Sequence, residues 1–316
     1  MLKLRVTRID AVTPRICCIE FQNADTGELP AFAAGAHIDV ELGNGEVRSY
    51  SLLNDPKERN RYVLGVLREQ SGTGGSDWVH DSLQTGDVLI AQLPSNDFPL
   101  DEEGGHHILI AGGIGITPIM SMAARLKSLG QSYALHYCAR SPAEAAFGDE
   151  LTASHGSKLS FHFDGGNPAA GLDLKSLLAV RPPAAHVYVC GPVGLIRAVR
   201  EAAKGWPEGM VHFELFKGSA KDTEPVSNDQ PFDIVLKRAN LTLTVPADKT
   251  ILQIVRAAGI KVKTLCTRGT CGTCRVGLVS GKVDHRDEVL DDDEKESFLQ
   301  VCVSRAMPGE TLVLDL

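Results

Sequence analysis

Residues 265–275 read LCTRGTCGTCR. The three cysteines of this stretch have a C-x4-C-x2-C spacing, and a fourth follows after 27 intervening residues. The four are Cys266, Cys271, Cys274 and Cys302. This is the spacing of the thiolate ligands in plant-type [2Fe–2S] sites. Gly269 and Gly272 allow the loop to fold tightly and to turn backbone amides toward the sulfurs. The stretch therefore predicts an iron–sulfur cluster on these four cysteines.

The alternatives are a zinc site with four cysteine ligands and a set of incidental cysteines. Zinc sites usually carry two C-x2-C pairs, whereas only Cys271 and Cys274 form such a pair here. Cys17, Cys18 and Cys138 lie in apolar strand-like runs, where a free thiol behaves as a small buried hydrophobe. The spacing favours a cluster in the loop and packing roles for those three.

The composition is typical of a soluble globular protein. Of the 316 residues, 43% are hydrophobic and 23% are charged, which predicts two or three domains. The formal charge of −8 argues against a nucleic-acid binder, which needs clustered Lys and Arg. The N-terminus does not read as a signal peptide, and no apolar run approaches the roughly 20 residues that span a bilayer. We therefore expect a cytoplasmic protein without membrane contact, in which a tight cysteine cluster indicates a metal or catalytic site rather than disulfides.

The chain divides into segments of different character. Residues 1–100 hold short β runs, which predict a small barrel or sandwich. Residues 101–220 alternate strand and helix patterns, which predict a parallel sheet. Residues 221–231 form a polar linker, and residues 232–316 a compact third domain. The β runs expected in the first two segments are Ile16–Phe21, His37–Leu42, Val47–Leu52, Tyr62–Leu67, Val88–Leu93, His107–Ala111, Ala134–Cys138, Leu159–Phe163, Val187–Cys190 and Val211–Leu215.

The third segment combines the cysteine loop with a few regular elements. We expect strands at Asp233–Leu236 and Leu241–Val245, a helix near Ile251–Ala258 and a final apolar run at Thr311–Leu316. With the loop, this segment resembles a plant-type ferredoxin domain, a β-grasp fold. Relatives often carry an acidic or neutral residue where this chain has Arg268, and we expect this cation to raise the potential of the cluster unless it points away into solvent or toward a partner.

Two motifs in the first segment point to a phosphate-bearing cofactor. Residues 48–52 read RSYSL after a strand-like approach, and residues 72–76 read GTGGS before a short helix. A glycine turn at a helix N-terminus binds phosphate, and an arginine at a strand end can clamp it. Alone, the first motif is weak, because Arg48 can be a surface cation and Tyr50 an aromatic at the barrel edge. Together the motifs resemble the flavin domain of the ferredoxin–NADP reductase superfamily, an antiparallel β-barrel.

This resemblance assigns the flavin contacts. It implies that Arg48 contacts the phosphate, that Tyr50 packs on the isoalloxazine, and that the Ser51 hydroxyl lies near N5. Leu67 stands where many relatives have a lysine and Arg68 comes next, so the second basic phosphate contact stays open. The motif and the N-terminal flavin domain resemble the phthalate dioxygenase reductase type and imply FMN, with FAD as the alternative. The other implied flavin contacts are Ser49, Gly65, Val66, Gly74, Gly75, Ser76, Thr117 and Phe216.

Residues 108–118, ILIAGGIGITP, join an apolar strand to a helix through a glycine turn. The glycines let a pyrophosphate approach the backbone and the positive helix end, and Pro118 suits the first helical turn. The full G-x-G-x-x-G spacing of a Rossmann dehydrogenase is absent. A second motif, residues 190–192 (CGP), follows another strand at its carboxyl end, where open α/β sheets bind ligands. Both motifs resemble the nucleotide domain of the same superfamily. The implied NAD(P) contacts are Gly112, Gly113, Gly115, Thr117, Pro118, Arg140, Ser141, Cys190, Gly191 and Pro192.

The resemblance also implies which residues align the two cofactors. Ser51, Cys190 and Glu214 are the catalytic candidates, with Cys190 beside the nicotinamide and Glu214 near it. Cys190 can instead be a small buried hydrophobe, and Phe216, the implied stacking partner of the flavin, can instead be core packing. Arg140 keeps NADPH open as the electron donor, but an arginine near this point is also common among NADH users of the family, so NADH is favoured.

The resemblance covers nearly the whole multidomain α+β chain. It implies the reductase component of a Rieske-type aromatic-ring oxygenase or O-demethylase, with a terminal Rieske non-haem iron oxygenase as partner. Electrons then pass from NAD(P)H through the flavin to the [2Fe–2S] cluster, and the cofactors carry the chemistry. A redox-sensing flavoprotein and a free flavin or ferric reductase are the alternatives. We expect a monomer. An acidic stretch, residues 284–296, precedes the fourth cysteine and is either a solvated face or a docking surface for the partner.

Overall fold

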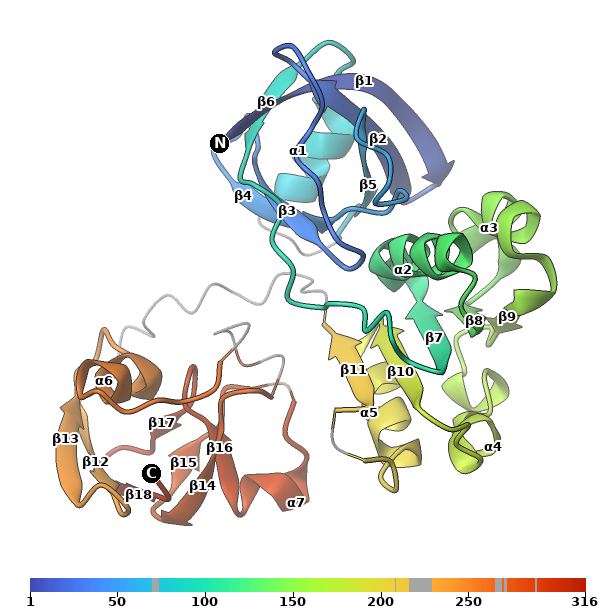
Figure 1. Cartoon of the computed structure of the whole chain (residues 1–316). Coiled ribbons are helices and arrows are strands. Elements are labelled where there is room, and N and C mark those ends of the chain that lie inside the picture. Colours follow the sequence, from blue (N-terminus) through green and yellow to red (C-terminus); the bar gives the residue numbers. More distant parts are fainter. Residues whose placement is uncertain (70–73, 208, 216–228, 265–268, 270–271, 288) are drawn as a thin grey trace. The chain divides into compact units, whose positions relative to one another are not determined.

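The computed structural model describes the chain except for residues 70–73, 208, 216–228, 265–268, 270–271 and 288 (Figure 1). Contacts divide the chain into two compact units, Met1–Ser219 and Ala220–Leu316. In the described residues, the first unit holds a six-stranded and a five-stranded sheet, and the second holds a five-stranded sheet and a two-stranded one.

The N-terminal segment forms a curved antiparallel sheet. In spatial order its strands are β4 (Val47–Ser51), β3 (His37–Glu41), β6 (Val88–Ala91), β1 (Leu2–Thr13), β2 (Ile16–Asn23) and β5 (Tyr62–Leu67). Bulges in β1, between Val6 and Arg8 and between Ala11 and Thr13, bend this long strand. A bridge between Leu52 and Leu64 brings the two ends of the sheet together, so that the sheet curls as a barrel does. A short helix, α1 (Gly75–Asp81), packs Val79 into the same core.

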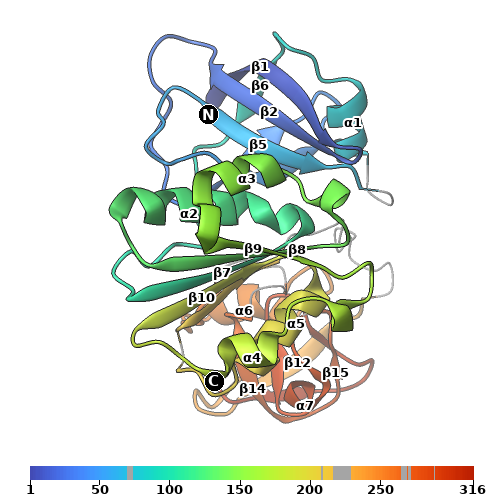
Figure 2. The same cartoon turned by 90° about the vertical axis from the view of Figure 1, so that its right-hand side faces the viewer.

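The second sheet is entirely parallel. In spatial order its strands are β11 (Val211–Glu214), β10 (Ala185–Cys190), β7 (His106–Gly112), β8 (Tyr133–Ala139) and β9 (Leu159–Phe163). Figure 2 shows helices α2 (Ile116–Leu129) and α3 (Gly148–His155) on one face and helices α4 (Leu174–Ala179) and α5 (Val193–Ala202) on the other. Because both faces are covered, β10 is buried at every position. Short 3-10 turns lie at η1 (Gly113–Gly115), η2 (Pro142–Glu144), η3 (Gly156–Lys158) and η4 (Pro168–Ala170).

The second unit is built on a mixed sheet. In spatial order its strands are β13 (Leu241–Val245), β12 (Phe232–Leu236), β18 (Leu312–Leu314), β14 (Arg275–Ser280) and β16 (Phe298–Gln300). Strands β12 and β18 run parallel, while the other pairs are antiparallel. Helix α6 (Ile251–Ala257) starts at a capping box of Thr250 and Gln253 and buries its apolar side in the core of the sheet. This arrangement is the predicted β-grasp. The remaining elements are β15 (Val283–Asp284), α7 (Asp292–Lys295) and β17 (Arg305–Ala306).

Each strand expected from the sequence is present, most with ends shifted by one to three residues. The sequence did not reveal β1, because its alternation is broken by the two bulges. It also did not reveal β14 to β17, which are short or lie beside the cysteine loop. No helix among the described residues is long and apolar enough to cross a membrane.

A stack of aromatic rings in the parallel sheet binds the backbone of Asp101, which lies in the segment that leads into β7. Tyr188 stacks on His212 with ring centroids 4.3 Å apart, and His186 Nδ1 lies 3.0 Å from His212 Nε2. The backbone N–H of Asp101 donates to the Tyr188 hydroxyl at 2.7 Å, and its carbonyl lies 2.7 Å from His107 Nε2. Burial is the main cause that lowers the pKa of His212, to about 4. The stack therefore depends on a neutral His212 imidazole.

Acid should destabilise the first unit through this stack. A histidine whose pKa falls from 6.5 to about 4 on folding binds fewer protons when folded, so its stabilising contribution is complete above 6.5 and declines as pH falls toward 4. A His212→Phe variant keeps a ring against Tyr188 but cannot titrate. Scanning calorimetry across this pH range should show a smaller decline in Tm for the variant than for the wild type. Equal declines would contradict this role of His212.

Candidate flavin, nucleotide and cluster sites

The two described cysteines of the predicted cluster site are both buried. Cys274 precedes β14 and Cys302 follows β16, and each is 2% exposed. The Gly269 N–H donates a hydrogen bond to Cys302 Sγ at 3.2 Å. Gly269 has φ +77°, and a Cβ there would lie 2.6 Å from Cγ2 of Val303. Glycine is thus required for the backbone to aim an amide at this sulfur, as a thiolate-bound cluster needs.

A residue that the sequence analysis did not single out lies beside the other sulfur. The Oε1 atom of Gln300 is 3.1 Å from Cys274 Sγ, and its Nε2 donates to the Gly272 carbonyl at 3.4 Å. Gln300 is fully buried. No local pattern in the sequence marks Gln300, because its contact with Cys274 depends on the pairing of β14 with β16.

Several predicted residues lie outside the described part of the chain. They are Cys266, Cys271, Arg268 and Phe216. The described half of the cluster site still fits the cluster, since it supplies two buried sulfurs and a backbone amide directed at one of them.

Alternation along β4 separates the residues of the first flavin motif. Arg48 and Tyr50 are half-buried, while Ser49 is exposed on the other side and its hydroxyl donates to Asp39. Burial is the main cause that raises the pKa of the Tyr50 phenol. Ser51 ends the strand and is buried. Only the backbone of Ser49 is therefore available on the side of Arg48 and Tyr50.

The second flavin motif lies against the first. The Arg48 side chain crosses the start of α1, since a Cβ on Gly75 would lie 3.0 Å from Arg48 Nε. Gly74 has φ +96°, and its carbonyl accepts from Asn44 Nδ2 at 3.3 Å. The Ser76 hydroxyl accepts from the Glu69 N–H at 3.0 Å. A side chain at Gly75 would fill the place beside the guanidinium, so the arrangement fits a phosphate held between arginine and backbone.

Arg68, the basic residue beside Leu67, is engaged by carboxylates of α1. Its Nε lies 2.9 Å from Asp77 Oδ1, and Nη2 also pairs with Asp81. Arg68 thus forms ion pairs with α1, whereas Arg48 is the motif arginine whose side chain lies over the glycines.

The barrel and the parallel sheet meet at predicted flavin contacts. A Cβ on Gly65 of β5 would lie 2.7 Å from Cγ2 of Thr117 at the start of α2. The Thr117 hydroxyl donates to the Ile114 carbonyl at 3.1 Å, which leaves its methyl toward Gly65. The bridge between Leu52 and Leu64 places Ser51 next to Gly65. Ser51, Gly65 and Thr117, far apart in the sequence, are thus brought together. Val66, the next residue of β5, is buried.

The two nucleotide motifs touch each other through glycines. A Cβ on Gly115 would lie 2.2 Å from the Cys190 carbonyl oxygen, and one on Gly112 would lie 2.8 Å from Cδ of Pro192. A Cβ on Gly191 would likewise lie against backbone atoms of Gly112. In the sheet register Cys190 pairs with Ala111, so both turns lie at the carboxyl edge. Gly113 has φ +53°, and Pro118 lies buried in the first turn of α2. A Cβ on Gly113 would meet nothing within 4 Å, so the backbone of this turn is open to a pyrophosphate.

Cys190 and Glu214 are neighbours on β10 and β11. Burial is the main cause that raises the pKa of the Cys190 thiol, with the Glu214 charge adding to it. Burial, with the charge of Asp97, raises the pKa of Glu214 to about 8. Within the described part of the chain, the buried Glu214 Oε2 has no hydrogen-bond partner. Such an orphaned oxygen fits a ligand that supplies the missing partner. The influence of Asp97 on Glu214 was not predicted from the sequence, because no local pattern marks Asp97.

Arg140 and Ser141 follow β8 at the same carboxyl edge. The Arg140 side chain is exposed, and the Arg140 carbonyl accepts from the Gly165 N–H at 3.0 Å. The Ser141 hydroxyl lies 3.5 Å from Glu144 Oε1. An exposed guanidinium at this edge is available to a nucleotide.

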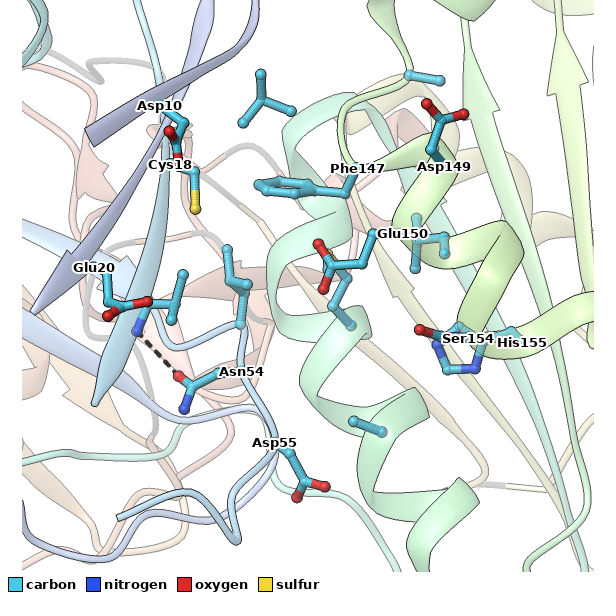
Figure 3. A pocket seen from close by; sticks show the side chains of 18 of the residues that line it. Asp10, Cys18, Glu20, Asn54, Asp55, Phe147, Asp149, Glu150, Ser154 and His155 are labelled. Atoms are coloured by element: carbon cyan, nitrogen blue, oxygen red, sulfur yellow. Dashed lines mark hydrogen bonds between the residues drawn. The ribbon is translucent and has the colours of Figure 1, made fainter. Parts of the chain in front are cut away.

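A groove of about 950 Å³ lies elsewhere in the first unit, between the barrel and helices α2 and α3 (Figure 3). Cys18 and Glu20 line it from β2, and Phe147 and Glu150 from the α3 side. None of the cofactor residues predicted from the sequence lines this groove. The groove still borders one candidate site, because a Cβ on Gly65 would lie 3.5 Å from Leu53 and Phe147 of its lining.

Comparison with known proteins adds to this geometry. A family model described as 2Fe-2S iron-sulfur cluster binding domain matches residues 234–307, which favours the cluster over zinc. The chain is 44% identical to phthalate dioxygenase reductase of Burkholderia cepacia, over 100% of this chain and 97% of the relative. It is 40% identical to vanillate O-demethylase oxidoreductase of a Pseudomonas strain, over 100% of both. The solved structure of phthalate dioxygenase reductase matches 100% of this chain and 98% of its own, with 43% identity and a TM-score of 0.70.

The contact between Gly65 and Thr117 can be tested by a double-mutant cycle. Gly65→Ala places a methyl 2.7 Å from Thr117 Cγ2, so it should destabilise the first unit by about 1–3 kcal/mol. Thr117→Ser removes the opposing methyl and should restore most of the loss in the double variant. Urea unfolding and the flavin content of the purified protein are the measurements. A double variant no more stable than Gly65→Ala alone would contradict the contact.

Proposed function

The chain belongs to the phthalate dioxygenase reductase and vanillate O-demethylase reductase family, and we propose that it is the reductase component of a Rieske-type oxygenase or O-demethylase system. It takes electrons from NADH through FMN and a [2Fe–2S] cluster to the terminal oxygenase. The observation that carries the proposal is the meeting of Ser51, Gly65 and Thr117 at the junction of barrel and parallel sheet, in a chain that also holds a cluster domain.

The barrel side of this junction would hold the flavin. Arg48 would neutralise the phosphate over the glycines of α1, and Tyr50 would pack against the ring. FMN, when bound, supplies the conversion between two-electron and one-electron transfer. FMN rather than FAD is supported by the resemblance of residues 48–52 and by the order of the segments.

The sheet side would hold the nicotinamide nucleotide. The glycines of residues 112–115 and 190–192 would admit the pyrophosphate, and the exposed Arg140 would lie near the adenosine end. Glu214, protonated below about pH 8, has an O–H to donate and an orphaned oxygen to accept, which suits a carboxamide. Cys190 is fully buried and the Oε2 atom of Glu214 is shielded from solvent, which would limit the access of water to the reacting edge.

The proposal extends to the compartment and the oligomeric state of the protein. We place it in the cytoplasm as a monomer. The cysteines Cys17, Cys18, Cys138 and Cys190 are free thiols, as a reducing compartment would keep them.

Cofactor analysis with nucleotide titration tests the proposal. The purified protein should release FMN on denaturation and contain iron and labile sulfide in equal amounts. NADH should support reduction of cytochrome c at much lower concentration than NADPH. A protein without flavin would refute the electron path, and one that releases its flavin during turnover would instead be a free-flavin reductase. Negligible turnover with bound cofactors would point to a redox sensor.

The acidic stretch offers a second test. Asp291 and Glu294 are occupied with capping α7, and Glu294 also pairs with Arg275 at 2.7 Å. Asp292 and Asp293 are exposed, so we propose that these two help to dock the partner. With the terminal oxygenase as acceptor, Asp292→Asn with Asp293→Asn should lower the rate and flatten its dependence on ionic strength. Asp248→Asn, at an exposed acid of the same unit, is the control. An unaltered salt dependence in the double variant would rule out docking by these acids.

A further inference from the structure

A buried amide lies at one predicted ligand of the cluster. Gln300 is fully buried, and Oε1 of its side chain is 3.1 Å from Cys274 Sγ. The strand register fixes this approach, because Gln300 pairs with Arg275, the residue that follows Cys274. Two further hydrogen bonds hold the backbone, since the Gln300 carbonyl accepts from the Val303 and Ser304 N–H groups at 3.2 and 3.0 Å. The position of the amide is therefore determined by the fold.

Packing alone does not account for a glutamine at this position. Burying a side-chain amide costs free energy unless its donors and acceptors are paired, and an apolar side chain of similar size avoids that cost. Here the polar partners are Cys274 Sγ and the carbonyl of Gly272. Both partners belong to the cysteine loop, so the polar contacts of the amide are all with that loop.

Loading of the cluster changes which atom of the amide suits the sulfur. Cysteine binds metal as the thiolate, which has no proton to donate and accepts hydrogen bonds. The Gln300 Nε2 carries two N–H groups, and rotation about the last side-chain bond is soft. Turning the amide about this bond exchanges the places of Oε1 and Nε2, so that an N–H faces the Cys274 sulfur and the bond to the Gly272 carbonyl is given up.

We propose that Gln300 donates a hydrogen bond to the Cys274 ligand sulfur and so raises the reduction potential of the cluster. The inference rests on the proposed [2Fe–2S] site and adds a positioning residue to it. Donation to a ligand sulfur stabilises the reduced, more negative cluster more than the oxidised one. Gln300 then complements the Gly269 amide, which bonds Cys302. Two of the four ligand sulfurs are each served by a donor from the described chain.

Replacing the amide by an apolar side chain of similar length tests this. Gln300→Met should lower the reduction equilibrium constant of the cluster about tenfold, which is about 59 mV for a one-electron couple. Redox titration followed by electron paramagnetic resonance is the measurement. Leu299→Met is the matched control, because Leu299 is also fully buried on β16 but its side chain points to the opposite face. Its midpoint should stay at the wild-type value.

An unchanged midpoint in a Gln300→Met protein that carries its cluster would overturn the proposal. The wild-type protein gives a second measurement, which decides the matter if the variant fails to fold. With ¹⁵N in glutamine side chains only, pulsed resonance of the reduced protein should show a ¹⁵N coupling, and its absence would overturn the proposal. A wild-type protein with no cluster signal at all would instead refute the proposed cluster site, so the two failures are distinct.

Discussion

Close approach of backbone to its neighbours is the constraint on which each candidate site depends. A Cβ at Gly65 would meet the Thr117 methyl, one at Gly115 would meet the Cys190 carbonyl, and one at Gly269 would meet Val303. These three glycines lie at the junction of barrel and sheet, at the nucleotide turns and at the cluster loop. At each place the missing side chain lets the backbone pack closely against its neighbour, and this packing fixes the backbone of the candidate site.

Much of this arrangement could be predicted from the sequence. Local signals are strong where a motif is contiguous, as in residues 108–118, where strand, turn and helix all form as expected. Contacts between distant segments are different, because they depend on register. That Gly115 packs against Cys190 follows from the pairing of β7 with β10, which no local pattern encodes. The side chain of Ser49 lies on the other face of β4 from Arg48, as alternation along a strand dictates.

Buried polar groups were the features hardest to predict from the sequence. Glu214 was found through resemblance, but its pKa is raised by burial and by the charge of Asp97, more than a hundred residues earlier in the chain. Gln300 carries no motif and is identified only by its contact with Cys274. Such groups cost free energy to bury, so their presence beside the proposed cofactor sites favours a role toward what would bind there. In the proposed sites, Glu214 would supply a carboxyl beside the nucleotide and Gln300 an amide beside the cluster.

The central claim is that a single chain carries electrons from a nicotinamide nucleotide through its first unit to the cluster of its second. Anaerobic rapid mixing of the holoprotein with NADH, followed by absorption, tests it most directly. We expect the flavin band to bleach first and the iron–sulfur band afterwards, at a rate independent of protein concentration. A cluster that is reduced before the flavin, or only at a rate proportional to protein concentration, would contradict an electron path within one chain.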